Sequence, residues 1–400
     1  MPVQGQTCNA YVGGYIPSYR DPGTVDYTKL THAFYAFAKT NSYGDIIIDN
    51  PTVFNTFKTA STGTQRYLSL SGGGDNTFIA MATSASARQA FASNCAIFCQ
   101  THALQGVDMD WEGIITTQDS AHYGALMRAL ASSLHSNGLN LTATVGFGSY
   151  SGDYYNVGAL KVADWIQLMV YDQTGTWAES PYGNHATYQH MLDAISYWAQ
   201  RGYSDLSKMV IGLPFYGYQF NSTQGGLATG LSYSEIISLY PGLSCDRDDA
   251  NLTVFNSPET IRKKVRYVIE NGLKGVMIWE MGQDLNSNNE RSLLKAVSLA
   301  TCGLPPSCNT FFTTGTSPEE SVQFFPMPMH GTLNISLDQP GLDAYSIELI
   351  NSIGQRLCNK ETTFPEGTEA IDVSGISPGI YYVRITQGNS RAIVKRVIKI

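Results

Sequence analysis

Apolar and polar residues alternate in two different ways along most of the chain. Between residues 8 and 300, short β-rich apolar runs alternate with segments of helical periodicity. The eight candidate strands are Ala10–Tyr15, Leu30–Ala38, Arg66–Ser71, Gly106–Trp111, Asn140–Val145, Trp165–Tyr171, Met209–Phe215 and Gly275–Glu280. Helical segments lie between them at Phe78–Ala103, Ala121–His135, Tyr188–Gln200 and Pro258–Asn271. This order predicts an α/β fold, a (β/α)8 TIM barrel over residues 1–301.

The pattern changes after Thr301. Residues 302–320 are rich in Pro, Ser, Thr and Gly, a composition typical of a linker. Short alternating strands then follow at Thr332–Asp338, Tyr345–Ile350, Ile380–Thr386 and Ala392–Ile400. Residues 321–400 are therefore expected to form a small all-β immunoglobulin-like sandwich.

One candidate strand alternates carboxylates with large apolar residues. Successive side chains of a strand point to opposite faces, so Asp108, Asp110 and Glu112 share one face at spacings of about 7 Å. A solvated acidic face would explain the pattern, but like charges weaken a strand and no Lys or Arg stands nearby. Crowded carboxylates raise one another's pKa, and one of them can then serve as a general acid near neutral pH.

Composition and charge narrow the possible partners. The formal net charge of −8 and a pI near 5.4 argue against nucleic acid or an anionic membrane as a partner. Only 14% of residues are charged, and 24 are Tyr, which suits an extracellular protein that meets a neutral polymer. No apolar run reaches the roughly 20 residues of a membrane span. Residues 1–6 show no signal-peptide pattern, so the chain is either cytoplasmic or has lost its signal.

The cysteines suggest neither a metal site nor a cofactor. Seven Cys and seven His are scattered without ligand spacing. Cys302 and Cys308 bracket a turn-rich stretch and could close a small disulfide loop. Cys95 and Cys99 lie four apart on a candidate helix, where small buried thiols are expected.

Residues 104–112, "LQGVDMDWE", resemble the signature of glycoside hydrolase family 18 chitinases. The resemblance implies that Glu112 protonates the glycosidic oxygen and that Asp110 holds the acetamido group of the substrate, with Asp108 behind it. Gln105 stands where the family has its first Asp, which leaves the tuning of Asp108 open.

Other strand ends carry further resemblances, at the barrel end where such enzymes place their chemistry. Residues 71–74, 169–172, 212–217 and 276–280 resemble the second motif, the "MxYD" element and the seventh and eighth strands of the family. The implied substrate-binding residues are Gly73, Met169, Asp172, Tyr216 and Trp279, with weaker support for Tyr15 and Phe37. Tyr171 is implied to bond the acetamido group. Trp177 is either an aromatic platform on the leaving-group side or a packed loop residue.

The segment 321–400 resembles the C-terminal sorting domain of type IX secretion in Bacteroidetes. The matching stretches are "FFPMPMHGTLNI", "IELINSIGQRL", "IDVSGISPGIYYVRI" and "VKRVIKI", with Met327-Pro328 in place of the usual Asn-Pro. This implies a partner in the type IX secretion machinery, a secreted or cell-surface location, and a signal peptide that has been removed. A carbohydrate-binding sandwich is the weaker alternative, because the segment contains no Trp.

Together the resemblances imply a secreted chitinase that acts as a monomer on chitin or chito-oligosaccharides. The α+β insertion that many members carry between the seventh and eighth strands is expected to be absent, and Asp75 replaces a common Trp. An open groove and endo-cleavage are therefore expected. An endo-β-N-acetylglucosaminidase acting on N-glycans and a non-catalytic lectin stay as alternatives, although such lectins typically lose the residue at Glu112.

Overall fold

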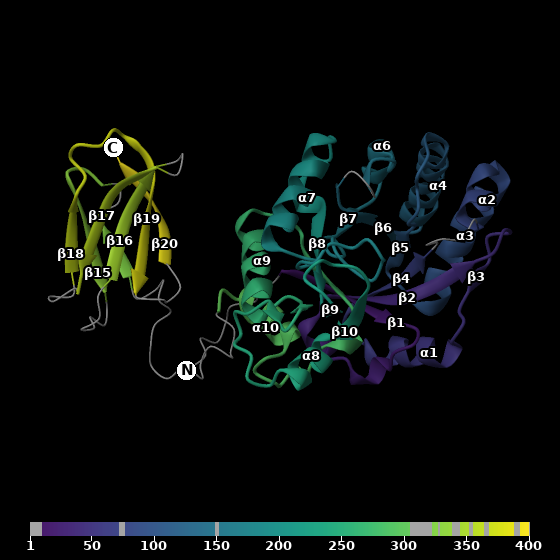
Figure 1. The fold of residues 1–400 in the computed structure, drawn as a ribbon. Coiled ribbons are helices and arrows are strands. Elements are labelled where there is room, and N and C mark those ends of the chain that lie inside the picture. The colour runs from purple at the N-terminus through teal and green to yellow at the C-terminus, as the bar shows by residue number, and fades with distance from the viewer. Residues whose placement is uncertain are drawn as a thin grey trace. The chain divides into compact units, whose positions relative to one another are not determined.

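A computed structural model describes residues 10–71, 77–148, 152–304, 322–326, 329–337, 345–351, 355–363, 368–387 and 393–399. The chain forms two compact units, Met1–Asn309 and Thr310–Ile400, whose elements are labelled in Figure 1. Of the predicted linker at 302–320, only residues 302–304 belong to the described part.

Eight parallel strands close into a barrel in the first unit. They are β1 (Tyr11–Pro17), β2 (His32–Thr40), β4 (Gln65–Ser71), β5 (Gly106–Asp110), β6 (Asn140–Gly146), β7 (Trp165–Met169), β8 (Met209–Pro214) and β13 (Gly275–Trp279). They pair in the order β1-β13-β8-β7-β6-β5-β4-β2, and β2 also pairs with β1. The short strand β3 (Ile46–Ile47) extends β2 antiparallel. The predicted (β/α)8 barrel is confirmed, and every predicted barrel strand overlaps an observed one.

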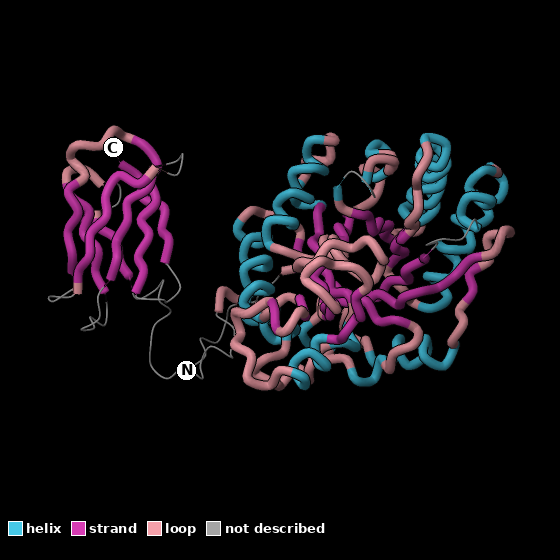
Figure 2. The backbone as a smooth tube through the Cα atoms, in the orientation of Figure 1, coloured by secondary structure: helices cyan, strands magenta, loops and turns pink. Residues whose placement is uncertain are grey.

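Helices surround these strands, as Figure 2 shows in cyan. They are α1 (Pro51–Ala60), α2 (Thr77–Thr83), α3 (Ala85–His102), α4 (Thr117–Ser136), α6 (Val157–Leu160), α7 (Tyr188–Gln200), α8 (Tyr233–Leu239), α9 (Pro258–Glu270) and α10 (Leu293–Thr301). The prediction of one helix over Phe78–Ala103 was wrong. Ser84 has extended backbone angles, and its hydroxyl accepts from the N–H of Ala87, so a new helix begins there. None of the described helices combines the length and apolarity needed to cross a bilayer.

The interval between β8 and β13 contains more than the barrel helix α9. Strands β9 (Tyr216–Phe220), β10 (Ala228–Ser232), β11 (Asp249–Ala250) and β12 (Thr253–Val254) form an antiparallel sheet in the order β10-β9-β12-β11, beside α8. The α+β insertion was expected to be absent from this interval, but a short sheet and a helix, α8, stand there beside α9. The missed strands are short, and glycines and polar residues interrupt them, so no period-two pattern marks them in the sequence.

The barrel strands separate two buried layers. Val107, Met109 and Trp111 lie in the apolar layer that also holds helix residues. Asp108 and Asp110 are 0% and 4% exposed and lie on the opposite face, toward the barrel interior. The predicted alternation along this strand is therefore confirmed. The interior is filled largely by aromatic side chains of the barrel strands, and these share one buried cluster with aromatic residues beyond the strand ends: Tyr11, Tyr15, Phe34, Tyr67 and Trp165 with Tyr171, Tyr216 and Tyr218.

A glycine allows the acidic strand to approach its neighbour closely. A Cβ atom on Gly106 would lie 2.2 Å from the carbonyl oxygen of Asn140. Only a residue without a side chain fits between two backbones at that separation. Gly106 thereby fixes the start of β5 against β6. The register of this pairing then places Asp108 beside Thr142.

The second unit consists of two antiparallel sheets around one apolar core. One sheet contains β14 (Val322–Phe325), β15 (Thr332–Leu337) and β18 (Thr368–Asp372), and the other contains β16 (Tyr345–Asn351), β17 (Arg356–Thr362), β19 (Gly379–Gln387) and β20 (Ile393–Lys399). This arrangement confirms the predicted sandwich. The sequence did not reveal β14, β17 and β18, each of which lies at the edge of its sheet. The last two are mostly polar, because edge strands bury little surface.

The described cysteines fall into two groups. Cys95 and Cys99 are buried free thiols, as expected, and Cys358 is a half-buried free thiol. Cys245 and Cys302 each take part in a disulfide bond. Cys308 lies outside the described residues, so its pairing with Cys302 stays a prediction.

We expect the first unit to keep its stability when the chain is truncated after Asn309. Its buried clusters contain only its own residues, and the second unit has a separate core. The melting temperature of the barrel, measured by differential scanning calorimetry, should change by less than about 2 °C. The full-length chain is the control. A fall of roughly 5 °C or more would show that the barrel depends on the second unit.

Candidate active site

Asp108 lies at the centre of the barrel in a saturated hydrogen-bond network. Its carboxylate accepts from side chains of four other strands: Tyr15 Oη (2.8 Å), Ser69 Oγ (2.8 Å), Thr142 Oγ1 (2.6 Å), Thr144 Oγ1 (3.0 Å) and Gln167 Nε2 (3.1 Å). These donors converge on both oxygens of the carboxylate from several directions. Asp108 is therefore held in one orientation beneath the rest of the cluster.

Gln105 does not take part in this network. Its side-chain oxygen accepts from the backbone N–H of Arg66 at 2.6 Å, and its own N–H donates to the carbonyl of Arg66 at 2.8 Å. The residue thus pins β5 to β4 at the start of the strand. The donors around Asp108 come from elsewhere, so the substitution at Gln105 leaves them in place.

Asp110, two residues further along β5, has a different environment. It is 4% exposed, and its Oδ1 has no hydrogen-bond partner among the described residues. Burial raises the pKa of this carboxyl well above its usual value, and the charges of Glu112 and Asp108 raise it further. Asp110 can therefore hold a proton where an exposed Asp would not, and one of its oxygens is free to accept from a ligand.

Glu112 follows the end of β5, and its side chain is open to solvent. The protein that surrounds its other sides raises the pKa of this carboxyl, mainly by desolvation and then through the charge of Asp172. A carboxylic acid that keeps its proton at an accessible position is the arrangement required of a general acid.

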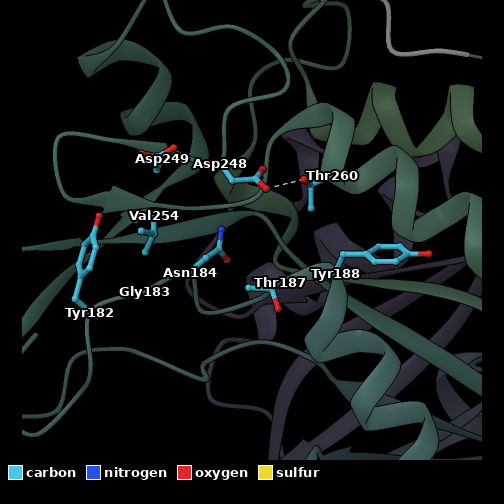
Figure 3. Close-up of a pocket in the computed structure, with 9 residues that line it drawn as sticks. All are labelled: Tyr182, Gly183, Asn184, Thr187, Tyr188, Asp248, Asp249, Val254 and Thr260. Carbon is cyan, nitrogen blue, oxygen red and sulfur yellow. Dashed lines mark hydrogen bonds between the residues drawn. The ribbon is translucent and has the colours of Figure 1, made fainter. Parts of the chain in front are cut away.

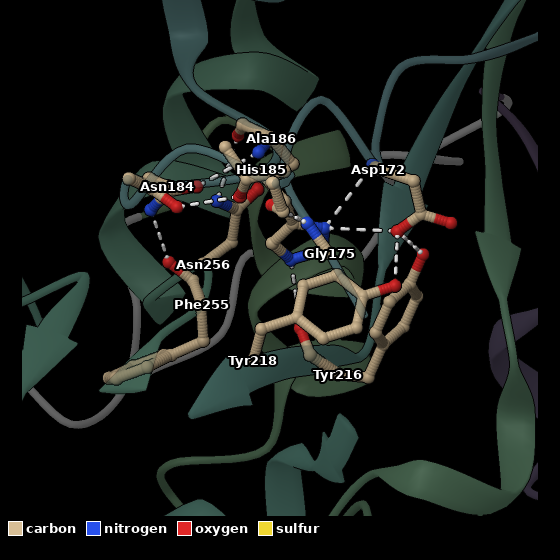
Figure 4. A network of polar contacts seen from close by, with 12 residues as sticks. Asp172, Gly175, Asn184, His185, Ala186, Tyr216, Tyr218, Phe255 and Asn256 are labelled. Atoms are coloured by element: carbon tan, nitrogen blue, oxygen red, sulfur yellow. Dashed lines mark hydrogen bonds and ion pairs between the residues drawn. The ribbon is translucent and has the colours of Figure 1, made fainter. Parts of the chain in front are cut away.

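Asp172 supplies that charge from the loop after β7. The residue has a φ of +61°, a conformation that non-glycine residues seldom adopt. Its Oδ1 accepts from the hydroxyls of Tyr216 at 2.6 Å and Tyr218 at 2.8 Å, and it lies 3.3 Å from Nδ1 of His185 (Figure 4). Burial alone would raise the pKa of Asp172, but His185 and the two tyrosines outweigh it and lower the pKa.

Aromatic side chains form the floor beside these acids. Trp279, half-buried at the end of β13, stacks on Phe37 with ring centroids 5.5 Å apart and meets Tyr15 edge-on at 5.7 Å. Tyr171 is buried, and burial followed by the charge of Asp110 raises the pKa of its phenol, which therefore stays a hydrogen-bond donor. Stacked rings of this kind suit the apolar face of a sugar.

The remaining residues predicted for the site make fewer contacts with the acids. Met169 is partly buried at the end of β7, and Trp177 is 42% exposed in the following loop. The hydroxyl of Tyr216 is engaged by Asp172, which makes Tyr216 a support of that acid. Gly73 lies outside the described residues.

Several residues of the site were missed from the sequence. Thr142, Thr144 and Gln167 occupy inward positions of β6 and β7, where polar residues alternating with apolar ones were an available signal. His185 and Tyr218 gave no such signal, because the folding of a loop brings them to Asp172.

A pocket of about 350 Å³ lies elsewhere, beside the loop that leads into α7 (Figure 3). It is lined by Tyr182, Gly183, Asn184, Thr187, Tyr188, Asp248, Asp249, Val254 and Thr260. None of the acids predicted for the site lines it. In the described part of the chain, no group of three or more His, Cys, Asp and Glu is arranged to hold a metal ion.

Asp110 should lower the free energy of unfolding at neutral pH. Its pKa is raised by folding, so the folded state holds a proton that the unfolded state releases, and stability falls as pH rises above the unfolded value of about 3.9. At pH 7, replacement by Asn (Asp110→Asn) should raise the melting temperature by about 2 °C or more, and the gain should vanish at about pH 3.5.

The exposed Asp193 on α7 provides the matched control, Asp193→Asn. The melting temperature of this variant should equal that of the unsubstituted chain at both pH values. An Asp110→Asn variant that is less stable at pH 7 would contradict the assignment of Asp110 as a strained, desolvated acid.

Comparison with known proteins agrees with this geometry. A class V chitinase of Arabidopsis thaliana is 27% identical over 337 residues, which are 70% of this chain and 88% of that protein. A family 18 chitinase from the chitin utilization locus of Flavobacterium johnsoniae has 27% identity and a TM-score of 0.62, over 73% of this chain and 94% of that one. A chitinase-like agglutinin of Robinia pseudoacacia has a TM-score of 0.60 at 23% identity, over 72% and 99% of the two chains, and shares the fold alone.

Two family profiles match the chain and divide it as its two units do. The secretion system C-terminal sorting domain matches residues 323–399. The profile of glycosyl hydrolases family 18 matches residues 11–284, which contain every described residue of the candidate site. The chain therefore belongs to the glycosyl hydrolases of family 18.

Proposed function

We propose that this chain is a secreted chitinase in which Glu112 is the general acid and base, and in which the substrate supplies its own nucleophile. The observation that carries the proposal is the contrast among the acids. Glu112 is accessible with a raised pKa, Asp110 is buried with an unpartnered oxygen, and Asp172 is tied to tyrosines. Among the described site residues, hydroxyl groups already engage the carboxylates of Asp108 and Asp172, which disfavours either as the nucleophile, and family 18 is a known exception to the two-carboxylate scheme.

The chemistry follows from these roles. Glu112 gives its proton to the glycosidic oxygen, and the C–O bond to the leaving sugar breaks. The acetamido oxygen attacks the anomeric carbon, while the acetamido N–H donates to the open oxygen of Asp110. Water then opens the cyclic ion and loses its proton to Glu112, so that two inversions give net retention.

The other site residues orient the sugar. The phenol of Tyr171 donates to the acetamido oxygen, and Trp279, supported by Phe37 and Tyr15, forms the floor under the ring. Met169 lines the same end of β7. Trp177, exposed in the loop after β7, is the platform on the leaving-group side. Gly73 is assigned to the substrate backbone on the family resemblance alone.

Secretion is the role of the second unit. Its match to a secretion-system sorting domain supports export to the cell surface or the medium through the type IX machinery. We expect the catalytic barrel to act as a monomer on chitin or chito-oligosaccharides. The excess of acidic residues favours no nucleic-acid partner.

One assay separates chitin hydrolysis from its two alternatives. The chain is incubated with colloidal chitin and, in parallel, with a high-mannose glycoprotein, and the products are identified by mass spectrometry. Chito-oligosaccharides should be released from the first substrate and no glycan from the second. Release of the N-glycan would favour an endo-β-N-acetylglucosaminidase, and tight binding of chitin without any product would favour a lectin.

Replacing the proposed acid gives the most specific test of its role. Glu112→Gln keeps the shape and the hydrogen bonding but has no proton to transfer, so turnover should fall about a thousandfold or more. Calorimetry should show that chito-oligosaccharides still bind. The control is Glu361→Gln, which removes an exposed carboxylate from the second unit and should keep full activity. Loss of binding together with activity would make Glu112 a structural residue.

A further inference from the structure

His185 occupies a buried position behind the catalytic acids. It lies in the loop between β7 and α7, with no exposed surface, and its ring packs against Tyr216 and Tyr218 at centroid distances of 5.0 and 4.9 Å. Its Nδ1 lies 3.3 Å from two atoms of Asp172, the backbone nitrogen and Oδ1. Its Nε2 lies 3.3 Å from the carbonyl oxygen of Tyr216.

These contacts close a ring of interactions, which Figure 4 shows. Asp172 accepts from the hydroxyl at one end of Tyr216, and His185 contacts the backbone carbonyl at the other end. The other ring nitrogen of His185 contacts Asp172, so the three residues form a closed ring of contacts. The end of β7 and the start of β9 are thereby held together through one side chain.

The loop on both sides of His185 is also fixed. The side chain of Asn184 donates to the carbonyl of Phe255 at 2.7 Å. The carbonyl of Ala186 accepts from Asn256 at 2.9 Å and from the buried ammonium group of Lys264 at 2.7 Å. Such anchoring leaves the imidazole little freedom to turn away from Asp172.

We propose that His185 is a positioning residue of the hydrolase, which holds Asp172, and through it the hydroxyls of Tyr216 and Tyr218, in place beside Glu112. The inference rests on the proposed role of Glu112. His185 does not touch the substrate, and it acts by keeping Asp172 oriented and ionised. The neighbouring charge of Asp172 then lets Glu112 hold a proton for the leaving group and regain one from water.

The charges around this pair determine the sign of the effect. His185 faces Asp172, Tyr216 and Tyr218, and its position also influences His190, which Lys264 approaches from α9. The charge of Asp172 acts on Glu112 and Tyr171, and Asp172 itself contacts His185, Tyr216 and Tyr218. Desolvation raises the pKa of Asp172, and His185 lowers it. Removing the contact with His185 therefore raises that pKa, and Asp172 becomes protonated at a higher pH.

Two variants at this position separate the two ring nitrogens. In His185→Asn the amide group lies near the position of Nδ1 and can still bond Asp172, whereas in His185→Gln it lies near Nε2 and reaches only the carbonyl of Tyr216. The control is His190→Gln. The ring of His190 is also buried but packs on Phe147 at 3.8 Å, and in the described part of the chain no hydrogen bond joins it to Asp172.

The readout is the pH profile of kcat/KM on a soluble chito-oligosaccharide, with Glu112→Gln measured alongside. For His185→Gln the acid limb should move upward by about one pH unit and kcat should fall roughly tenfold. His185→Asn should restore most of both quantities. His190→Gln should change the melting temperature alone.

Each outcome decides one point. If Glu112→Gln is inactive and the His185→Gln profile overlays that of the unsubstituted chain, the His185 proposal is overturned and the proposed function stands. If Glu112→Gln keeps full turnover, the proposed acid itself is wrong. An acid limb that moves equally in His185→Gln and His190→Gln would reduce His185 to a packing residue.

A second measurement does not depend on the folding of the His185 variants. Long-range 1H–15N NMR spectra report the ring nitrogens of the seven histidines. In Asp172→Asn, the two ring-nitrogen resonances of one imidazole should shift, because Nδ1 of His185 loses its contact with the carboxylate. If none moves, the contact between His185 and Asp172 has no electrostatic role, and the proposal fails.

Discussion

Two carboxylates on β5 and a third just beyond its end cannot all be ionised alike at close range, and the rest of the site is arranged around this constraint. The strand geometry spaces neighbouring acids by about 7 Å and turns them to the same side. The protein resolves the conflict by giving each acid different surroundings. Asp108 receives five donors, Asp110 receives none at one oxygen, and Glu112 stands at the solvent beside the anion of Asp172. The raised pKa values of Asp110 and Glu112 and the lowered pKa of Asp172 suit the different roles that we propose for these acids.

The barrel supplies this variety from many strands at once. Donors to Asp108 come from β1, β4, β6 and β7, while the partners of Asp172 come from β9 and from the loop before α7. Tyrosines recur in the interior because a phenol can pack as an apolar ring and still donate one hydrogen bond. A carboxylate can thus be buried while neutral hydroxyl and amide donors satisfy its oxygens.

The sequence predicted the parts of this structure that depend on local periodicity. Alternation along residues 106–112 places the acids on one face, and alternating strands and helices predict the barrel. The interval between β8 and β13 was misread because its strands are only two to five residues long. His185 could not be found in this way, because its contact with Asp172 needs the left-handed turn at φ +61° and the loop that follows. Contacts made by loop closure leave no periodic signal.

The central claim is that the acetamido group of the substrate, and not a carboxylate of the enzyme, attacks the anomeric carbon. It is tested most directly by digesting partially N-acetylated chitosan and identifying the sugar at each newly formed reducing end by mass spectrometry. If the neighbouring group is the nucleophile, every new reducing end carries N-acetylglucosamine, because glucosamine at that position lacks the attacking oxygen. New reducing ends with glucosamine in proportion to its content in the polymer would contradict the account.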